Sequence, residues 1–349
     1  MISNAMIKLT IKVFAVLGLW LILRRIQPDP KALEELEIET YDFDIADGCS
    51  NYSNISLASS SRNQSVLAVP KIVHYIFGLD QDFGGKEFGF IHFVSIYLTF
   101  KIIKPDEIFF HYRYLPQYNR WWNLASPFVT AVPARDLSTY KGISITQPFH
   151  RADILRLEIL LKHGGIYLDL DVIPLRPFDA LLTGSNVVMG WEGGTRSGLC
   201  NAIILATPQA EFLKQWLSTY TSFDPTEWNR HSIKIPAQLA SSSTNSDDIS
   251  TICILPPHAF FFPLWTKRHI SWMHAPLTTA ETKSEFNRSL IRDKHGSVML
   301  YDGQYAYHAW EQMSWSYLKD LDFRRLSNSE VNTRFGILLR AALDGVALS

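Results

Sequence analysis

Two aspartates stand two residues apart in the stretch "HGGIYLDLDVIPLRP", positions 163 to 177. Asp169 and Asp171 follow a short apolar run that is typical of a buried strand. Alternate residues of a strand point to the same side, so both carboxylates can face one point. Neighbouring carboxylates repel each other unless a counter-ion lies between them, which favours a hard divalent cation. The alternative is a pair of strand-end residues that cap backbone amides, and the triplet alone leaves both interpretations open.

The segment before the aspartates, "HRADILRLEILLKHGG", predicts a helix that has a broad apolar face and ends at Gly164-Gly165. Asp153 and Arg156 stand three residues apart near its start and therefore share one helical face. The alternative interpretation is an ordinary ion pair on a solvent-exposed helix face, which has the same spacing. However, a helix N-terminus with arginines near a metal-bound carboxylate pair also suits a diphosphate, whose charge the cation, guanidinium groups and backbone amides neutralise together.

Strand and helix patterns alternate from Val69 onward, which predicts an α/β fold with a mostly parallel central sheet. In such sheets ligands collect at the carboxyl ends of strands, which is where the two aspartates stand. The patterns predict strands over 69–78, 107–113, 128–134, 166–175 and 186–192, and helices over 88–104, 150–165, 210–220 and 334–343.

Charge and cysteine usage narrow the possible functions. The 349 residues carry a net charge of −1 without a dominant basic stripe, so we expect no nucleic-acid partner. Cys49, Cys200 and Cys253 are too few and too scattered for a zinc site or a disulfide framework. At most one disulfide can form among them, and we expect Cys200 to pair with Cys253 because Cys49 stands in a flexible-looking region.

The N-terminus has an uninterrupted apolar run over 13–23 with basic residues on both sides, including Arg24-Arg25. No small-residue cleavage site follows, which favours an uncleaved signal anchor over a cleaved signal peptide. Three Asn-x-Ser sequons, at Asn51, Asn54 and Asn63, lie in the serine-rich stretch that follows, and a fourth is at Asn287. We therefore expect a single-pass type II protein of the Golgi or ER membrane with a lumenal catalytic domain. The expected organisation is a cytosolic tail and anchor over 1–27, a glycosylated stem over 28–68, a catalytic domain over 69–325 and a C-terminal helix or tail over 326–349.

The segment "HRADILRLEILLKHGGIYLDLDVIPLRPFD" resembles glycosyltransferase family 32, in which a helix with (S/R)-x-D-x-x-R precedes Gly-Gly-(I/V)-Tyr-x-Asp-x-Asp. Three further segments are similar to segments of that family. They are "VPKIVHYIFG", its opening strand; "GLCNAIILATPQAEFLKQWL", its asparagine-containing strand and following helix; and "YAYHAWEQMSW", its closing segment. The four segments occur in family order and span Val69 to Leu318.

This resemblance implies a GT-A fold, a nucleotide-sugar donor, a Mn²⁺ (or Mg²⁺) ion and retention of the anomeric configuration. It implies that Asp171 binds the metal and that Asp169 bridges the metal and the donor. Asp153 and Arg156 would then hold the sugar hydroxyls and the diphosphate. Phe77 stands where the family often has a tryptophan that stacks on the base. The remaining donor-binding positions implied are Ile76, Tyr167, Asn201, His308 and Trp315, and for His308 a buried core histidine is the alternative.

The expected reaction is metal-dependent transfer of a hexose, with a front-face mechanism, to a hydroxyl of a glycan or glycolipid. GDP-mannose is favoured over a UDP-sugar as the donor. Glu192 is either a residue on the acceptor side or an ordinary loop carboxylate. Two alternatives stay open: a phosphatase of the haloacid-dehalogenase type, which also ends an apolar strand in Asp-x-Asp, and a non-catalytic glycan-binding relative.

Overall fold

A seven-stranded sheet lies at the centre of the protein in the computed structural model, which describes residues 68–193, 195, 198–243, 252–294, 296–327 and 331–344. Its strand order is β10-β8-β9-β6-β1-β2-β3. The neighbours β1–β2, β1–β6, β2–β3 and β10–β8 run parallel, whereas β9 runs antiparallel to β6 and β8. The predicted α/β fold with a mostly parallel sheet is therefore confirmed. In sheet order the strands span Ile252–Leu255, Val187–Trp191, Leu199–Ala206, Gly165–Leu168, Ile72–Phe77, Glu107–Tyr112 and Thr130–Pro133.

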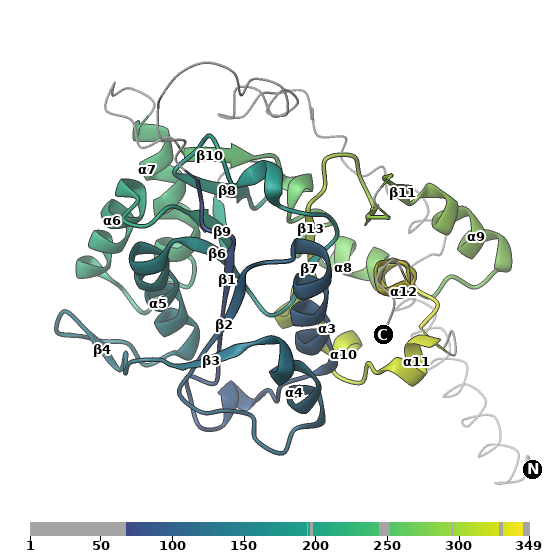
Figure 1. Cartoon of the computed structure of the whole chain (residues 1–349), viewed down its shortest axis with the longest axis horizontal. Coiled ribbons are helices and arrows are strands. Elements are labelled where there is room, and N and C mark those ends of the chain that lie inside the picture. The colour runs from purple at the N-terminus through teal and green to yellow at the C-terminus, as the bar shows by residue number, and fades with distance from the viewer. Residues whose placement is uncertain are drawn as a thin grey trace, which may run out of the picture. The chain divides into compact units, whose positions relative to one another are not determined.

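Helices cover both faces of this sheet, and each face has its own buried cluster (Figure 1). On one face lie α5 (Pro148–His163), α6 (Glu211–Ser218) and α7 (Ile235–Ser243). The helices that pack into the other cluster are α3 (Phe90–Leu98), α4 (Arg120–Ala125), α8 (Lys267–His274), α10 (Glu311–Leu318), α11 (Phe323–Ser327) and α12 (Arg334–Asp344). The helix α9 (Ala280–Ser289) contacts α12, and the exposed sequon residue Asn287 lies in it.

Three short strand pairs lie outside the central sheet. They are β4 (Thr139–Tyr140) with β5 (Ile143–Ser144), β11 (Ile291–Arg292) with β12 (Val298–Met299), and β7 (Val172–Pro174) with β13 (Ala306–His308). The last pair brings the segment after the two aspartates against residues more than 130 positions later in the chain.

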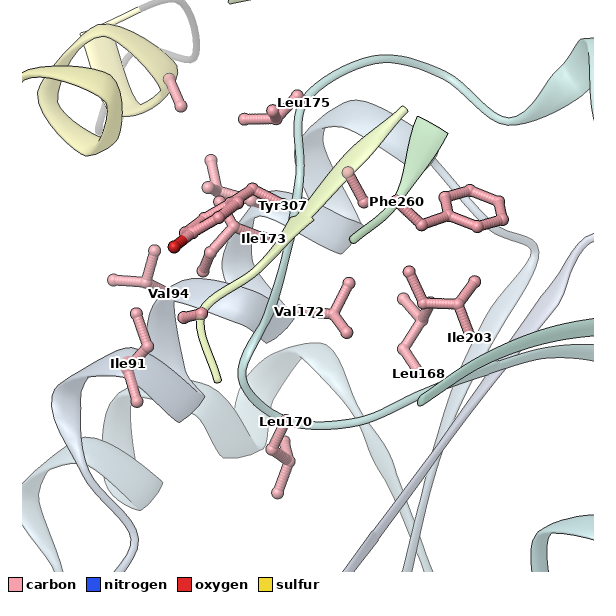
Figure 2. Close-up of a cluster of buried hydrophobic side chains, with 14 of the residues drawn as sticks. Ile91, Val94, Leu168, Leu170, Val172, Ile173, Leu175, Ile203, Phe260 and Tyr307 are labelled. Carbon is pink, nitrogen blue, oxygen red and sulfur yellow. The ribbon is translucent and has the colours of Figure 1, made fainter. Parts of the chain in front are cut away.

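The predicted single strand over 166–175 is wrong, because the chain turns at the aspartates. β6 ends at Leu168, the amide of Val172 donates to the carbonyl of Asp169 at 3.0 Å, and β7 then joins β13 instead of the central sheet. A continuous apolar pattern does not distinguish one strand from two strands with a turn between them. Leu168, Leu170 and Val172 pack with Ile91, Val94, Ile203 and Phe260 in one buried cluster (Figure 2). These side chains anchor the turn on its apolar side.

The other predicted strands and helices are present within a few residues of their expected ends. The Gly164-Gly165 pair ends α5 as predicted, with φ values of +64° and +101° that disfavour other residues. A Cβ on Gly165 would lie 2.7 Å from the carbonyl oxygen of Ile72, so β6 approaches β1 closely only with glycine there. The pair therefore lets the chain leave α5 and enter the sheet directly.

The predicted anchor, stem, Cys49 and the sequons at Asn51, Asn54 and Asn63 lie outside the described residues. Among the described helices none is long and apolar enough to cross a bilayer. The expected Cys200–Cys253 disulfide is wrong: Cys200 is a free, buried thiol, whereas Cys253 is disulfide-bonded. Cys200 lies in β9 and Cys253 in β10, with β8 between them in the sheet, and the two cysteines therefore do not meet.

Candidate active site

Asp169, Asp171 and His308 converge at the carboxyl end of β6. Each offers one ligand atom, and the three atoms all lie within 4.8 Å of one another. The His308 Nε2 atom is 3.1 Å from Asp171 Oδ1. His308 ends β13, whose pairing with β7 places it directly beside Val172. The fold therefore adds an imidazole to the carboxylate pair that the sequence pattern identified.

The C-terminal segment also holds Asp171 through its backbone. The backbone amide of Glu311, at the start of α10, donates to Asp171 Oδ2 at 2.7 Å, and the amide of Ala309 donates to the Asp171 carbonyl at 2.8 Å. The first backbone amides of a helix have no partner within the helix, and the helix dipole favours an anion at that end. Asp171 thus fixes the start of α10 next to the site.

Asp153 and Arg156 of α5 lie behind Asp169 in a hydrogen-bonded network with Asn201. Arg156 Nη2 pairs with Asp153 Oδ1 at 3.3 Å, and Arg156 Nη1 contacts Asp169 Oδ1 at 3.2 Å and the Asn201 carbonyl at 2.7 Å. Asn201 Nδ2 donates to Asp153 Oδ1 at 2.7 Å. Asp153 and Arg156 thus form an ion pair, but the pair is buried and not on a solvated face, because both side chains are less than 10% exposed.

Tyr167 supports the same aspartate from within β6. Its hydroxyl donates to Asp169 Oδ1 at 2.6 Å, and the Arg156 guanidinium lies over its ring, 4.4 Å from the centroid. Both hydrogen bonds to Asp169 use Oδ1, which leaves Oδ2 for a cation or substrate.

The surroundings move the pKa values of the two aspartates in opposite directions. Burial raises the pKa of Asp169; the Arg156 charge opposes this and the Asp171 charge adds to it. Burial also acts to raise the pKa of Asp171, but the His308 charge and hydrogen bond and the Glu311 amide outweigh it and lower that pKa. Burial acts to lower the pKa of His308, and Asp171 more than compensates, so that pKa is raised. Asp171 therefore favours the protonated form of His308, whereas a bound cation would require the neutral imidazole.

A cavity of about 540 Å³ opens in front of these residues. Its wall includes six of the predicted site residues: Asp153, Arg156, Asp169, Asp171, Asn201 and His308. The loop residue Glu192 also lines it, and burial raises the Glu192 pKa. The free thiol of Cys200 is part of the same wall.

The other four predicted donor-binding residues do not line this cavity. Phe77 ends β1 and packs among Phe83, Phe88, His92 and Phe110. Ile76 packs against the cluster on the other face of the sheet, and Tyr167 lies behind Asp169. Trp315, in α10, lies under the Lys86 ammonium, which is 5.1 Å from its ring centroid.

Arg151, the other arginine of α5, lines a separate cavity of about 550 Å³. Its Nη2 atom pairs with Asp80 at 2.8 Å and donates to the Thr146 carbonyl at 2.8 Å. Arg156 is therefore the arginine of α5 that serves the Asp169–Asp171 site.

Sequence reasoning missed several residues of the main cavity. The described lining of this cavity contains one lysine, Lys86, and one arginine, Arg156. Arg156 already pairs with Asp153 and Asp169. Lys86 is one-third exposed, with its nearest carboxylate oxygen, on Glu311, 3.8 Å away. The Gly-Gly-Lys order that follows the first strand was the available signal for this residue. Trp228 and Trp265 also line the cavity, from loops whose sequence carries no comparable pattern.

The ligand atoms of Asp169, Asp171 and His308 fit a divalent cation. Two carboxylate oxygens with one imidazole nitrogen suit Mn²⁺, which accepts both donor types, and Mg²⁺ prefers oxygen alone. The charge agrees as well, because a dication would neutralise the two neighbouring carboxylates.

Comparison with known proteins identifies the family of this chain. Residues 114–188 match the family model described as "Glycosyltransferase sugar-binding region containing DXD motif". Glucan organizing enzyme 1 of Cryptococcus neoformans var. grubii is 33% identical over 276 residues, covering 76% of this chain and 68% of the relative. Subversion of eukaryotic traffic protein A of Legionella pneumophila is 38% identical over 66 residues, which are 18% of this chain and 10% of the relative.

Solved structures were compared as well. PaToxG glycosyltransferase aligns with a TM-score of 0.34 and 15% identity, over 79% of this chain and 87% of its own. Glycosyltransferase GlyE of Streptococcus pneumoniae TIGR4 aligns with a TM-score of 0.41 and 10% identity. The alignment covers 78% of this chain and 62% of the GlyE chain.

The chain belongs to the family of glycosyltransferases with a DXD-containing sugar-binding region, and it is an enzyme of that class. The "DLD" triplet at 169–171 lies within the matched region. This assignment sets aside both the phosphatase and the non-catalytic alternatives.

Proposed function

We propose that this glycosyltransferase is metal-dependent and retaining, and that it transfers a hexose from a nucleotide-sugar to a hydroxyl of a glycan or glycolipid. The observation that carries the proposal is the convergence of Asp169, Asp171 and His308 in one cavity with the Asp153–Arg156 pair. A strand-end carboxylate pair on a mostly parallel sheet is also the arrangement expected of a GT-A fold. We favour GDP-mannose as donor because of the short predicted anchor and serine-rich stem.

The residues around the cavity have distinct roles in this proposal. Asp169 and Asp171 with His308 would hold Mn²⁺ or Mg²⁺, which stabilises the charge that develops on the departing diphosphate. Asp153, held in place by Asn201 and Arg156, accepts hydrogen bonds from the donor sugar hydroxyls. Lys86 adds a positive charge that substrate phosphate can reach, because its own ion pair is long.

The proposed chemistry is a front-face displacement. The acceptor hydroxyl attacks the anomeric carbon from the side on which the diphosphate leaves, so the bond to the acceptor oxygen forms as the bond to the phosphate oxygen breaks. The hydroxyl proton passes to the departing diphosphate, and the configuration is retained. Asp153, the carboxylate next to Arg156, is tied to Asn201 and Arg156, which suits it to orient the sugar rather than to form a glycosyl ester.

We also propose that the catalytic domain is lumenal, in the Golgi or ER, behind an N-terminal anchor. The disulfide-bonded state of Cys253 supports an oxidising compartment. The sequons after the predicted anchor support the same orientation. Treating the full chain, expressed in a eukaryotic cell, with an N-glycan-removing enzyme should shift its mobility, and an unshifted cytosolic product would contradict this localisation.

A panel of nucleotide-sugars with Mn²⁺, scored by release of the nucleoside diphosphate, tests the reaction. We expect release from one donor, loss of release after chelation, and recovery when Mn²⁺ is restored. Asp171→Asn should lower kcat by about 10³-fold or more, because it removes a charge that acts on the transition state. Asp179→Asn, at an exposed aspartate, is the control. Full turnover in Asp171→Asn, or turnover that is indifferent to chelation, would refute the metal role.

A further inference from the structure

Two tryptophans of the cavity wall are unusually exposed. Trp228 is 52% exposed and Trp265 is 44% exposed, although tryptophan is highly buried on average because burying its ring is favourable. Met313, beside them in the cavity lining, is 54% exposed. The cavity therefore presents flat apolar surface to solvent around a charged floor.

The Trp228 ring packs on a neighbouring aromatic ring, and the backbone on both sides of Trp265 is held in place. Trp228 precedes the helical turn at Arg230–Lys234, and its ring lies 4.2 Å from that of Phe149 at the start of α5. Trp265 stands two residues after Pro263, whose carbonyl accepts a hydrogen bond from Trp310 Nε1 at 2.9 Å, and directly before Thr266, the N-cap of α8. A ring that is supported in this way can bind a ligand without a large loss of conformational freedom.

Polar side chains accompany the two rings in the cavity wall. Asn229 is adjacent to Trp228, and Ser232, Glu192 and Gln312 line the same cavity. A pyranose ring has C–H groups on its faces and hydroxyls around its edge. Aromatic faces carry negative charge density that attracts C–H groups, and amide and hydroxyl side chains can bond the edge. A lipid chain would instead suit a continuous apolar lining, which this wall lacks.

The geometry points to an acceptor subsite in which Trp228 and Trp265 contact the pyranose rings of an acceptor carbohydrate. This inference rests on the proposed function, because it makes the carbohydrate the group whose hydroxyl attacks beside Asp169 and Asp171. The class of acceptor is then a glycan, or the sugar portion of a glycolipid, and not a simple lipid alcohol.

Trp228→Ala and Trp265→Ala test the subsite, with Tyr118→Ala as the control because Tyr118 is 97% exposed and is not part of the cavity lining. Acceptor probes are mannose and glucose tetrasaccharides, their monosaccharide methyl glycosides and octanol. Each tryptophan variant should raise the KM for the tetrasaccharide acceptor by about tenfold, the change expected when a stacking contact is lost. Tyr118→Ala should leave the acceptor KM, the donor KM and the release of nucleoside diphosphate with water as the acceptor as in the unmodified protein.

The outcomes separate this inference from the proposed function. Unchanged tetrasaccharide KM in both variants, a raised donor KM in place of a raised acceptor KM, or efficient use of octanol would overturn the acceptor subsite. Failure of the unmodified protein to release nucleoside diphosphate from any donor would count against the proposed function. Binding of the tetrasaccharides, followed by calorimetry, gives a readout that needs no turnover: we expect weaker binding in both tryptophan variants, and equal binding in all proteins would again overturn the subsite.

Discussion

The Nε2 atom of His308 lies 3.1 Å from Oδ1 of Asp171, although 137 positions separate the two residues in the chain. The antiparallel pairing of β13 with β7 produces this contact, because it sets His308 opposite Val172, the residue after Asp171. The carboxylate pair thereby gains an imidazole from the far end of the chain, which can bind a cation as the neutral ring.

His308→Gln should weaken metal binding by about tenfold or more, because it removes one of three ligands. Mn²⁺-induced stabilisation, measured by thermal unfolding at a fixed metal concentration, should then fall by about 1.4 kcal/mol. His163→Gln, at the exposed end of α5, should keep the full stabilisation. An equal Mn²⁺ effect in all three proteins would remove His308 from the metal site.

Lys86→Met should lower kcat with the nucleotide-sugar by about 10- to 100-fold, because hydrogen bonds to charged groups contribute about 1.5 to 3 kcal/mol. It should also weaken product inhibition by the nucleoside diphosphate. Lys86→Arg should recover most of the activity, and Lys214→Met, on the exposed side of α6, should change neither quantity. If Lys86→Met leaves both kcat and product inhibition intact, the lysine does not contact the phosphates.

The buried histidines predict loss of stability below neutral pH. His74 Nε2 lies 3.0 Å from the Gly164 carbonyl and must donate to it, so His74 Nδ1 accepts from His111 Nε2 at 3.1 Å. Burial lowers the pKa of His74 to about 4 and that of His111 to about 3. Histidine in the unfolded chain has a pKa near 6.5. Between about pH 6.5 and pH 4 the unfolded chain therefore binds more protons at these two residues than the folded protein does.

Stability from this pair is fully present above about pH 6.5 and decreases as the pH falls towards 4. His111→Gln keeps an N–H donor but removes one titrating group, so the slope of the unfolding free energy against pH should decrease by about 1.4 kcal/mol per pH unit within that window. Urea unfolding at several pH values measures the slope. A slope identical to that of the unmodified protein would mean that His111 gains a proton readily in the folded state.

Gly165→Ala should destabilise the protein by more than about 2 kcal/mol, because the new Cβ would clash with the Ile72 backbone in addition to straining the positive φ. Gly142→Ala is a matched control: its φ is +85°, but no atom lies within 4 Å of the added Cβ. It should show only the smaller strain cost. Similar melting temperatures for the two variants would show that β6 can move away from β1.

The local patterns around the aspartates predicted much of the site. The expected helix is present as Pro148–His163, the glycine pair ends it, and Asp153 and Arg156 share one of its faces, because each of these features depends on neighbours a few positions away. The central sheet could be predicted as well, since alternating strand and helix patterns favour one layered arrangement. The turn at 169–172 was missed because apolar periodicity continues through it.

No local sequence pattern shows which cysteine forms a disulfide or which residues lie around the cavity. Both depend on contacts between distant parts of the chain. Lys86, Trp228 and Trp265 come from loops whose residues share no spacing with the motif, and they meet only in the cavity. Likewise, Phe77 occupies its expected place at the end of β1, yet its ring packs among other aromatic residues outside the cavity lining.

The sequence by itself determined the catalytic motif and the α/β layers, because hydrophobic periodicity, helix ends and glycine conformations act within a few residues of each other. Only the tertiary structure decided how Asp171 is held, which lysine the cavity offers and which aromatic rings stay exposed. Those features depend on β13 pairing with β7 and on loops packing from distant parts of the chain, and residues so far apart in the sequence share no local pattern.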